Sequence, residues 1–307
     1  MIEILGAPYD LCGLRPGSRM GPAALRMADL AEALRGLVGD VVDGGDVTVV
    51  GTSTEPDGLR CFSSFFELVS GLRTMAITSL KGGRVPVLLG GDHSIAVSGV
   101  SAALEVFQGD VALLWIDAHA DINTPATSST GNVHGMPVAA LQGIASGVGG
   151  ATDRDWQRLL GLLGETRLKP QATSWLGLRD VDVHEKLLVR SGLGITMTDI
   201  DRMGMATCVG QIDDFIRASG AKNLWVSFDV DVLDPVLAPG TGTAVRGGLT
   251  YREAHLLAEL LHEKTLEGQY RLAGLDIVET NPLVDSENAT AKIAVEWALS
   301  LFGKTIL

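Results

Sequence analysis

Short apolar runs alternate along the chain with longer segments whose apolar positions recur at helical spacing. The apolar runs are each followed by glycine or charged residues, and they occupy residues 1–6, 85–91, 111–117, 173–180, 223–229 and 271–279. Because these runs are continuous rather than alternating, they are typical of strands covered on both faces in a parallel sheet. Helical spacing is found at 21–38, 65–80, 94–107, 208–220, 250–263 and 287–303. This succession predicts right-handed crossovers and a doubly wound α/β fold.

Local signals refine this prediction at three places. Gly21-Pro22 is a favourable helix start, and Thr250 stands three residues before Glu253, which is the spacing of a capping box. The glycine-rich segment 143–153 is predicted to be a loop. The 307 residues contain no internal repeat, low-complexity tract or clear linker, so we predict a single three-layer α/β/α domain over residues 1–307.

The composition narrows the classes of partner. The formal net charge is -13 and Lys and Arg are not clustered, which argues against nucleic acid or an anionic membrane as a partner but is compatible with a small cationic substrate. No apolar run approaches the roughly 20 residues that a membrane helix needs. The start MIEILGAPYD lacks a signal peptide's basic and apolar regions, and Cys12, Cys61 and Cys208 form no CxxC pair. These features predict a reduced, cytoplasmic protein.

Candidate metal ligands follow three of the predicted strands. In DAHADINTP (117–125), Asp117, His119 and Asp121 occupy every second position, and successive side chains of a strand alternate between its faces. SFDVDVLDP (227–235) repeats this spacing with two aspartates, Asp229 and Asp231, and VPVLLGGDHS (85–94) places His93 after a Gly-Gly turn. In an open parallel sheet, ligands bind beyond the carboxyl ends of the strands. The six side chains are therefore expected to meet there.

Charge and ligand chemistry predict which metal would be bound. Four adjacent carboxylates repel one another and resist ionisation unless a positive charge compensates them. Carboxylate oxygens with two imidazoles and no thiolate favour Mn²⁺, and six protein ligands exceed the needs of one tetrahedral zinc. A binuclear Mn²⁺ cluster is the resulting prediction. His184, His255 and His262 lie in helical or loop segments and are not predicted to be ligands.

The order of the motifs carries a resemblance to a known family. GGDHS, DAHADINTP, GNVHGMP, SFDVDVLDP, PGTGT and LDIVETNP, in this order, closely resemble the ureohydrolases, the arginase and agmatinase family, over nearly the whole chain. The resemblance implies one α/β domain around a mostly parallel eight-stranded sheet, with two Mn²⁺ per subunit at its carboxyl edge. It also implies that His93 and Asp121 ligate the first metal, His119 and Asp231 the second, and that Asp117 and Asp229 bridge both. All six positions are intact, which favours an enzyme over a non-catalytic metal-binding scaffold.

The resemblance further implies a mechanism. A metal-bridging hydroxide would attack the guanidinium carbon, and an amine would leave as urea forms. Asp121 would carry a proton to the leaving nitrogen, because a neutral amine leaves more readily than its anion. Glu279 would hold the guanidinium, and His134 would relay protons with a pKa near its ordinary value of about 6.5. Thr243 would support the site through its hydroxyl. The alternatives are a buried structural carboxylate for Glu279 and turn-closing roles for His134 and Thr243.

The expected substrate is L-arginine, which would give L-ornithine and urea. The DINTP and TGNVHG segments resemble the arginase branch, which implies that Asn123 and Thr130 bind the α-carboxylate and Asp182 the α-ammonium, with Glu185 nearby. Thr130 replaces the serine that is more usual at this position. The segment RPGSRMGP (15–22) looks more like agmatinases, so an agmatinase or guanidinobutyrase is the alternative.

The resemblance also implies an assembly. Asp201, Arg252 and Glu253 match positions that make charge contacts between arginase subunits, which suggests a homotrimer or a hexamer of two trimers. Pairs within one chain, or single surface charges, are the alternative interpretation of the same residues.

Overall fold

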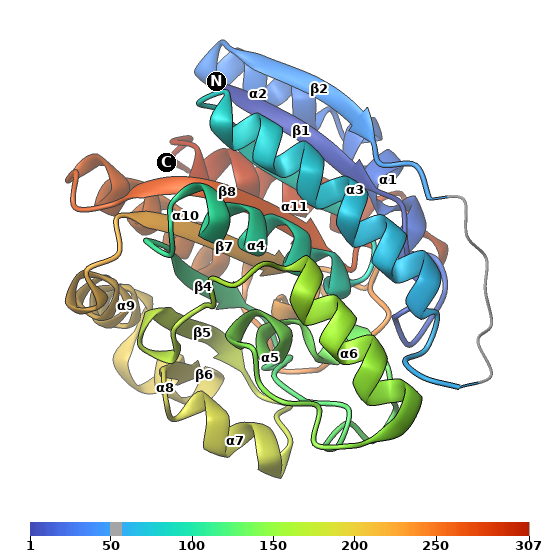
Figure 1. The fold of residues 1–307 in the computed structure, drawn as a ribbon. Coiled ribbons are helices and arrows are strands. Elements are labelled where there is room, and N and C mark those ends of the chain that lie inside the picture. The colour runs from blue at the N-terminus through green and yellow to red at the C-terminus, as the bar shows by residue number, and fades with distance from the viewer. Residues whose placement is uncertain (50–56, 307) are drawn as a thin grey trace.

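One parallel sheet organises the structure, a computed structural model that describes residues 1–49 and 57–306. Its eight strands lie in the order β2-β1-β3-β8-β7-β4-β5-β6 (Figure 1). Every neighbouring pair is parallel. The strands are β1 Ile2–Ala7, β2 Val41–Asp46, β3 Val85–Gly90, β4 Ala112–Ile116, β5 Thr173–Leu178, β6 Leu193–Thr196, β7 Asn223–Asp229 and β8 Arg271–Val278. All six predicted strands are present, and the α/β fold class is confirmed.

Helices cover both faces of this sheet. They are α1 Gly21–Met27, α2 Leu30–Val38, α3 Phe62–Lys81, α4 Ala96–Val106, α5 Pro137–Gln142, α6 Gly150–Leu162, α7 Val183–Val189, α8 Met197–Met203, α9 Met205–Ser219, α10 Tyr251–Leu266 and α11 Ala289–Leu301. One apolar core joins a sheet face to α1, α2 and α8 to α11, and a second joins the opposite face to α3 to α7. In Figure 1, α3, α4 and α6 lie in front of the sheet, and α10 and α11 lie behind it.

Chain order places the central strands far apart in sequence. After β3 the chain passes to β4, and the space between these two strands is filled later by β7 and β8. The four central strands β3, β8, β7 and β4 are almost entirely buried. The direction in which successive strands are added to the sheet reverses in this region. In open α/β sheets, ligands bind beyond the carboxyl ends of the strands at such a point.

Several elements differ from the sequence prediction. The helix expected over 21–38 is two helices, because Asp29 between α1 and α2 has a left-handed backbone with φ 62°. The loop expected over 143–153 ends early, since α6 already begins at Gly150. The edge strands β2 and β6 were not predicted. β2 contains two glycines and β6 has four residues, so neither shows a continuous apolar run.

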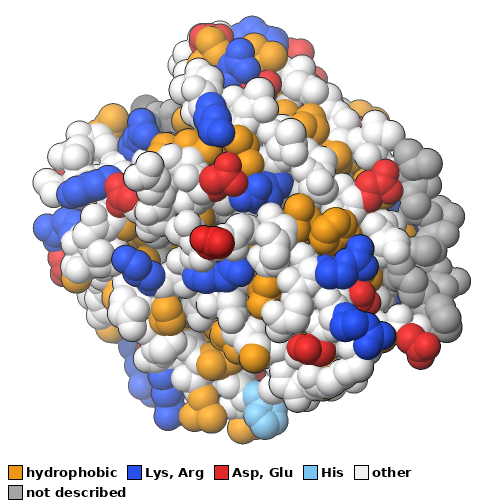
Figure 2. All heavy atoms as spheres, viewed as in Figure 1, with side chains coloured by type: hydrophobic (Ala, Val, Ile, Leu, Met, Phe, Trp, Pro, Cys, Tyr) orange, Lys and Arg blue, Asp and Glu red, His pale blue; other side chains and the backbone are white. Residues whose placement is uncertain are grey.

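Other helix signals agree with the structure. Thr250 caps α10, with its hydroxyl accepting from the Glu253 backbone while the Glu253 side chain accepts from the Thr250 backbone. α1 begins at Gly21, with Pro22 in its first turn. Among the described residues, no helix is both long and apolar enough to span a bilayer. On the face shown in Figure 2, Lys and Arg side chains are interspersed with Asp and Glu rather than gathered in one patch.

Candidate metal centre and substrate pocket

The four central strands each deliver one acidic or imidazole side chain to the carboxyl edge of the sheet. His93 follows β3, Asp117 follows β4, Asp229 is the last residue of β7, and Glu279 follows β8. All four side chains are at least 96% buried. The expectation that several strand ends supply one site agrees with this arrangement.

A glycine after β3 makes the convergence possible. A Cβ on Gly91 would lie 2.0 Å from the backbone oxygen of Tyr9, so only glycine fits beside this segment of backbone. Its amide donates to the backbone of Ala7, and its carbonyl accepts from the amide of Glu279 at 2.8 Å. The Glu279 carboxylate in turn accepts from the amide of His93 at 3.0 Å. The β3 and β8 ends are thereby held side by side.

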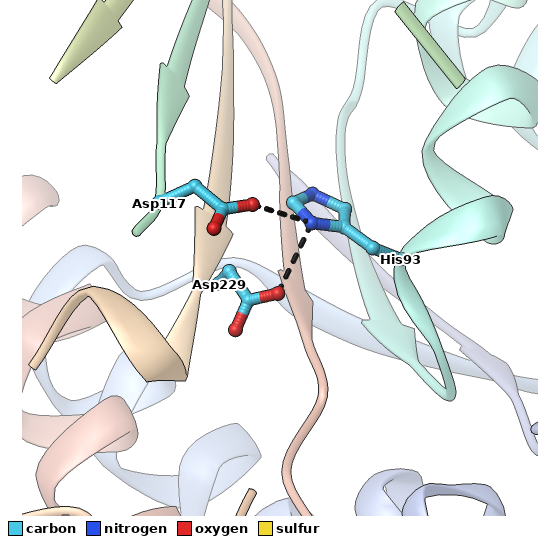
Figure 3. Close-up of side chains that lie close together, drawn as sticks. All are labelled: His93, Asp117 and Asp229. Atoms are coloured by element: carbon cyan, nitrogen blue, oxygen red, sulfur yellow. Dashed lines mark ion pairs between the residues drawn. The ribbon is translucent and has the colours of Figure 1, made fainter. Parts of the chain in front are cut away.

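His93 faces three carboxylates. Its Nδ1 lies 3.0 Å from Asp117 Oδ2, 3.1 Å from Asp229 Oδ2 and 3.2 Å from Asp121 Oδ2. Figure 3 shows Asp117 and Asp229 pointing from their strand ends toward this ring. His93, Asp117 and Asp229 offer ligand atoms within 4.8 Å of one another, as a shared metal ion requires.

A second group lies beside the first and shares one residue with it. His119 Nδ1 is 3.2 Å from Asp117 Oδ1 and 3.1 Å from Asp231 Oδ2. These three residues also offer ligand atoms within 4.8 Å of one another. Asp117 thus turns one carboxylate oxygen toward each group, which is the arrangement of a residue that bridges two ions. Thr243 donates to Asp231 Oδ2 at 2.8 Å, so its hydroxyl contacts a candidate ligand directly.

Neighbouring side chains fix the orientation of His93 and Asp117. Ser227 Oγ lies 2.8 Å from His93 Nε2, on the side of the ring opposite the carboxylates. Trp115 stacks on the same ring with centroids 3.9 Å apart, and its indole N–H donates to Asp117 Oδ2 at 3.0 Å. The ring and the bridging carboxylate therefore have little freedom to turn away from the site.

The carboxylates of the site resist ionisation in the absence of a cation. Burial is the largest cause, and it raises the pKa of Asp229, Asp231 and Asp121, with the charge of a neighbouring aspartate as the next cause. Asp117 differs, because burial raises its pKa but the facing imidazoles of His119 and His93 outweigh burial and lower the pKa. A divalent cation would remove the common obstacle by compensating the charge.

The imidazoles point to the same conclusion. Burial lowers the pKa of His93 and His119, but the facing carboxylates outweigh it and raise both pKa values. His93 Nδ1 is buried and makes no well-formed hydrogen bond, although three carboxylate oxygens lie within 3.2 Å. Nitrogen and oxygen lone pairs that converge in this way fit a shared metal ion better than hydrogen bonding. The residues present therefore fit a metal cluster.

Glu279 and His134 form a pair beside the two groups. His134 Nδ1 lies 3.1 Å from Glu279 Oε1. Burial lowers the pKa of His134, but the hydrogen bond with Glu279 outweighs it and raises the pKa to about 9. The expectation of an ordinary pKa near 6.5 for His134 is therefore wrong, because a carboxylate from a distant strand end faces the ring. Asp121 and Glu279 both have left-handed backbones, with φ of 50° and 60°.

His119, Asp121, His134, Asp229 and Thr243 line an open pocket of about 240 Å³, and the other members of the two groups lie beneath them. The lining residues are Leu14, His119, Asp121, Asn123, Ser128, Ser129, Thr130, Asn132, His134, Gly135, Asp180, Asp182, Glu185, Asp229 and Thr243. We call His93, Asp117, His119, Asp229 and Asp231 the floor, and Asn123, Ser128, Ser129, Thr130, Asp180 and Asp182 the rim. The described lining contains five carboxylates and no Lys or Arg, so the pocket suits a cation.

Glu185 in α7 connects two of the segments that form the pocket. Glu185 is 4% exposed, and its two oxygens accept from the amides of Ile122 and Asp182 at 3.0 Å each. Burial raises the pKa of Glu185 to about 7. Asn123 donates its amide to Asp182 Oδ2 at 3.0 Å. Glu185 thus connects the segment after Asp121 to the start of α7.

To the residues singled out from the sequence, the structure adds Arg60, Asp92, Asn132 and Asp180. Thr130 is exposed at the rim, and Asn132 beside it is buried and accepts from Arg60 at 2.5 Å. Asp180 Oδ2 lies 3.9 Å from His119 Nε2. Asp92 is fully buried, and burial followed by the charge of Glu279 raises its pKa to about 7. Arg60 follows no apolar run, whereas Asp92 stands within GGDHS and could have been noticed there.

The remaining histidines lie elsewhere. His184 is exposed in α7, His255 contacts Ser300 at 2.8 Å, and His262 contacts the Leu301 carbonyl at 3.1 Å. Within residues 1–49 and 57–306, none of the three belongs to a group that could hold a metal.

Comparisons with known proteins agree with this geometry. The model of the Arginase family matches residues 1–303. An arginase from Staphylococcus aureus (strain COL) is 36% identical over 313 residues, which cover 100% of this chain and 98% of the relative. The structure of the arginase from Bacillus caldovelox has a TM-score of 0.89 at 35% identity, with 100% of this chain and 99% of that chain covered.

A further solved structure comes from a different organism. The arginase of Entamoeba histolytica, in complex with L-ornithine, has a TM-score of 0.85 at 26% identity, with 99% of this chain and 98% of that chain covered. The fold and the nearly complete mutual coverage agree across these comparisons. The chain belongs to the arginase family.

Proposed function

We propose that this protein is a binuclear manganese ureohydrolase that hydrolyses the guanidinium group of L-arginine to L-ornithine and urea. The observation that carries the proposal is Asp117, whose two carboxylate oxygens face two separate groups of candidate ligands at the floor of an acidic pocket. Arginase relatives of nearly equal length support the same reaction. Residues 1–307 would form one catalytic domain.

The proposed ligands are those of the floor together with Asp121. His93, Asp121, His119 and Asp231 would each bind one ion, and Asp117 and Asp229 would bridge. A donor set dominated by carboxylate oxygens, with no cysteine in either group, favours Mn²⁺ over a thiolate-rich zinc site. When bound, such a pair of ions supplies hydroxide at neutral pH, because it lowers the pKa of water.

Three side chains would perform the proton transfer and hold the substrate. Asp121 Oδ2 points toward the first group, where it can take a proton from the nucleophile and return it to the leaving nitrogen. Glu279 would accept hydrogen bonds from the guanidinium through its carboxylate. His134, with its raised pKa, holds its proton at neutral pH and can exchange it with solvent from the wall of the pocket.

The rim would recognise the amino-acid end of the substrate. Asn123 and Thr130 line the pocket and would bind the α-carboxylate, while Asp182 would accept from the α-ammonium. Glu185 would support this end indirectly, because both its oxygens are occupied by backbone amides. Thr243 would steady Asp231. The E. histolytica arginase was solved with L-ornithine, and we extend that ligand class to this chain.

Assembly into a homotrimer or a hexamer of two trimers is part of the proposal. Asp201 and Arg252 are exposed, and Arg252 Nη1 lies 3.5 Å from Glu259 within the same chain. Glu253 caps α10, so its carboxylate has an intrachain role as well. Light scattering on the purified protein would measure the mass of the particle.

A panel of guanidino compounds tests the proposed reaction. We expect the protein preincubated with Mn²⁺ to release urea from L-arginine much faster than from agmatine or 4-guanidinobutyrate. Faster release from either of the latter would overturn the arginase assignment and support the agmatinase or guanidinobutyrase alternative. No urea from any compound, with Mn²⁺ bound, would support a non-catalytic scaffold.

A further inference from the structure

A buried aspartate behind the metal centre ends a chain of hydrogen bonds that begins at His93. Asp276, in β8, is fully buried and lies on the far side of Ser227 from His93. Its Oδ1 accepts from Ser227 Oγ at 2.5 Å, and Ser227 Oγ lies 2.8 Å from His93 Nε2. The chain of contacts therefore joins β8, β7 and the β3 end.

The hydrogen-bond donors around Asp276 determine which atom donates and which accepts in each of these hydrogen bonds. The indole N–H of Trp225 can only donate, and it donates to Asp276 Oδ2 at 2.6 Å. Ser227 Oγ donates its single proton to Asp276 Oδ1, because an ionised carboxylate only accepts. The Ser227 oxygen then has lone pairs but no proton for His93, and it can only accept from Nε2–H.

The consequence for His93 concerns its second nitrogen. A neutral imidazole carries one proton, so a proton held on Nε2 leaves Nδ1 with a free lone pair. Nδ1 is the atom that faces Asp117, Asp229 and Asp121. A proton on Nδ1 would instead point into the position of a metal ion.

We propose that Asp276 is a positioning residue that sets the tautomer of His93 through Ser227 and so prepares Nδ1 for one of the two metal ions. The proposal rests on the proposed function, because it assigns His93 as a ligand. Asp276 itself contacts neither metal nor substrate. Asp276 is connected through Ser227 to His93. Among the described contacts, no such connection leads from Asp276 to His119.

Asp276→Asn tests the proposal because an amide carries donors. If its NH₂ faces Ser227, the direction of the chain reverses and Ser227 donates to Nε2. If its NH₂ faces Trp225, two donors oppose each other and the contact to Ser227 weakens. Outer partners of metal-bound histidines typically contribute about 10- to 100-fold in metal affinity. We expect the variant to bind one Mn²⁺ per chain at least about tenfold more weakly and the other within about twofold.

The measurement is a Mn²⁺ titration of the full-length protein, with free Mn²⁺ followed by its electron paramagnetic resonance signal. Ser227→Ala removes the intermediate and should weaken the same ion by a similar factor. In the Ser227→Ala background, Asp276→Asn should change the affinity by less than about twofold, because the connection to His93 is already broken. Ser174→Ala in β5, another fully buried serine, which donates to the Leu113 carbonyl, is the matched control and should leave both affinities unchanged.

A spectroscopic signature separates positioning from simple stabilisation. In the zinc-loaded protein with ¹⁵N-labelled histidine, we expect a slowly exchanging Nε2–H proton signal for His93 that disappears in Ser227→Ala. Asp276→Asn should shift or abolish this signal. Trp225→Phe removes a donor from the same carboxylate without changing the direction of the chain, so it should keep the signal.

Three results would overturn the inference. They are unchanged Mn²⁺ affinity in Asp276→Asn, an equal loss at both ions, and a loss of the same size with and without Ser227. Failure of the wild-type protein to bind two Mn²⁺ would contradict the proposed function instead, so the two failures can be told apart.

Discussion

The floor and the rim of the pocket are built in different ways. Floor residues stand at or just after the ends of central strands, and their side chains are almost fully buried, except for His119 at 24% exposure. Rim residues lie on the segments after β4 and β5, where the Asp180 side chain is 71% exposed. The sheet therefore determines where the reaction would occur, whereas loops determine what would bind. Variants at the two levels should differ in both the kind and the size of their effects.

The largest effect is expected at the floor. Asp117→Ala removes the one residue shared by both candidate metal groups. Metal ions contribute several kcal/mol of transition-state stabilisation, so we expect activity to fall on the order of 10³-fold or more and bound Mn²⁺ to fall with it. Urea release and elemental analysis measure the two quantities. Asp180→Ala is the rim control and should cost less than about tenfold in activity. Full metal content in Asp117→Ala would contradict the bridging role.

A second variant separates metal binding from proton transfer. Asp121→Asn keeps the shape of the side chain but removes its ability to carry a proton. We expect it to retain Mn²⁺ and to lose about 10²- to 10⁴-fold in kcat, the usual contribution of a general acid or base. Elemental analysis with steady-state kinetics would check both parts. Undiminished turnover would remove Asp121 from the chemistry.

The connection between rim and floor should be visible in stability against pH. Burial raises the pKa of Glu185 to about 7 from an ordinary value of 4.5, so the folded protein holds this proton more tightly than the unfolded chain. Its stabilisation is complete below pH 4.5 and is lost as the pH rises through 7. The loss amounts to about 3 kcal/mol for a shift of this size in a group that is almost fully buried.

Glu185→Gln tests this dependence. Urea unfolding of the metal-free protein at pH 5 and pH 8 should show a clear loss of stability in the wild type and a smaller loss in the variant. Equal losses in the two proteins would show that Glu185 does not titrate in this range.

The smallest effect is expected at the rim itself. Asp182→Asn retains a residue suited to cap α7 but removes the charge that would face the α-ammonium of arginine. A hydrogen bond between charged groups suggests about a tenfold rise in KM for arginine, with kcat little changed. 4-Guanidinobutyrate, which has no such ammonium, is the matched substrate and should show no change. An equal rise for both compounds would move Asp182 out of substrate recognition.

The central sheet could be predicted from sequence, and its edges could not. Strands β3, β4, β5, β7 and β8 are covered on both faces, so each shows a continuous apolar run. β2 and β6 lie at the edges, where fewer apolar residues are needed. The break between α1 and α2 depends on the left-handed backbone of Asp29, which helical periodicity does not indicate.

The candidate site shows the same division. Residues placed by strand ends, such as Asp117 and Asp229, could be selected as candidates because they follow apolar runs at alternating positions. The contact between Asn132 and Arg60 joins residues 72 positions apart, and the His134 contact with Glu279 joins residues 145 positions apart. Such contacts depend on how loops meet in space, so neither the partners nor the raised pKa of His134 could be read from motifs.

The left-handed backbones of Asp121 and Glu279 carry a cost of their own. Glycine adopts this conformation freely, whereas other residues pay a steric penalty, although it is modest for aspartate. At these two positions glycine would have the lowest conformational energy, but glycine has no carboxylate. The two acids therefore lower the stability of the folded protein slightly. Directed evolution that selects only for thermostability would favour glycine at both positions, and the resulting variants would lose the proposed activity.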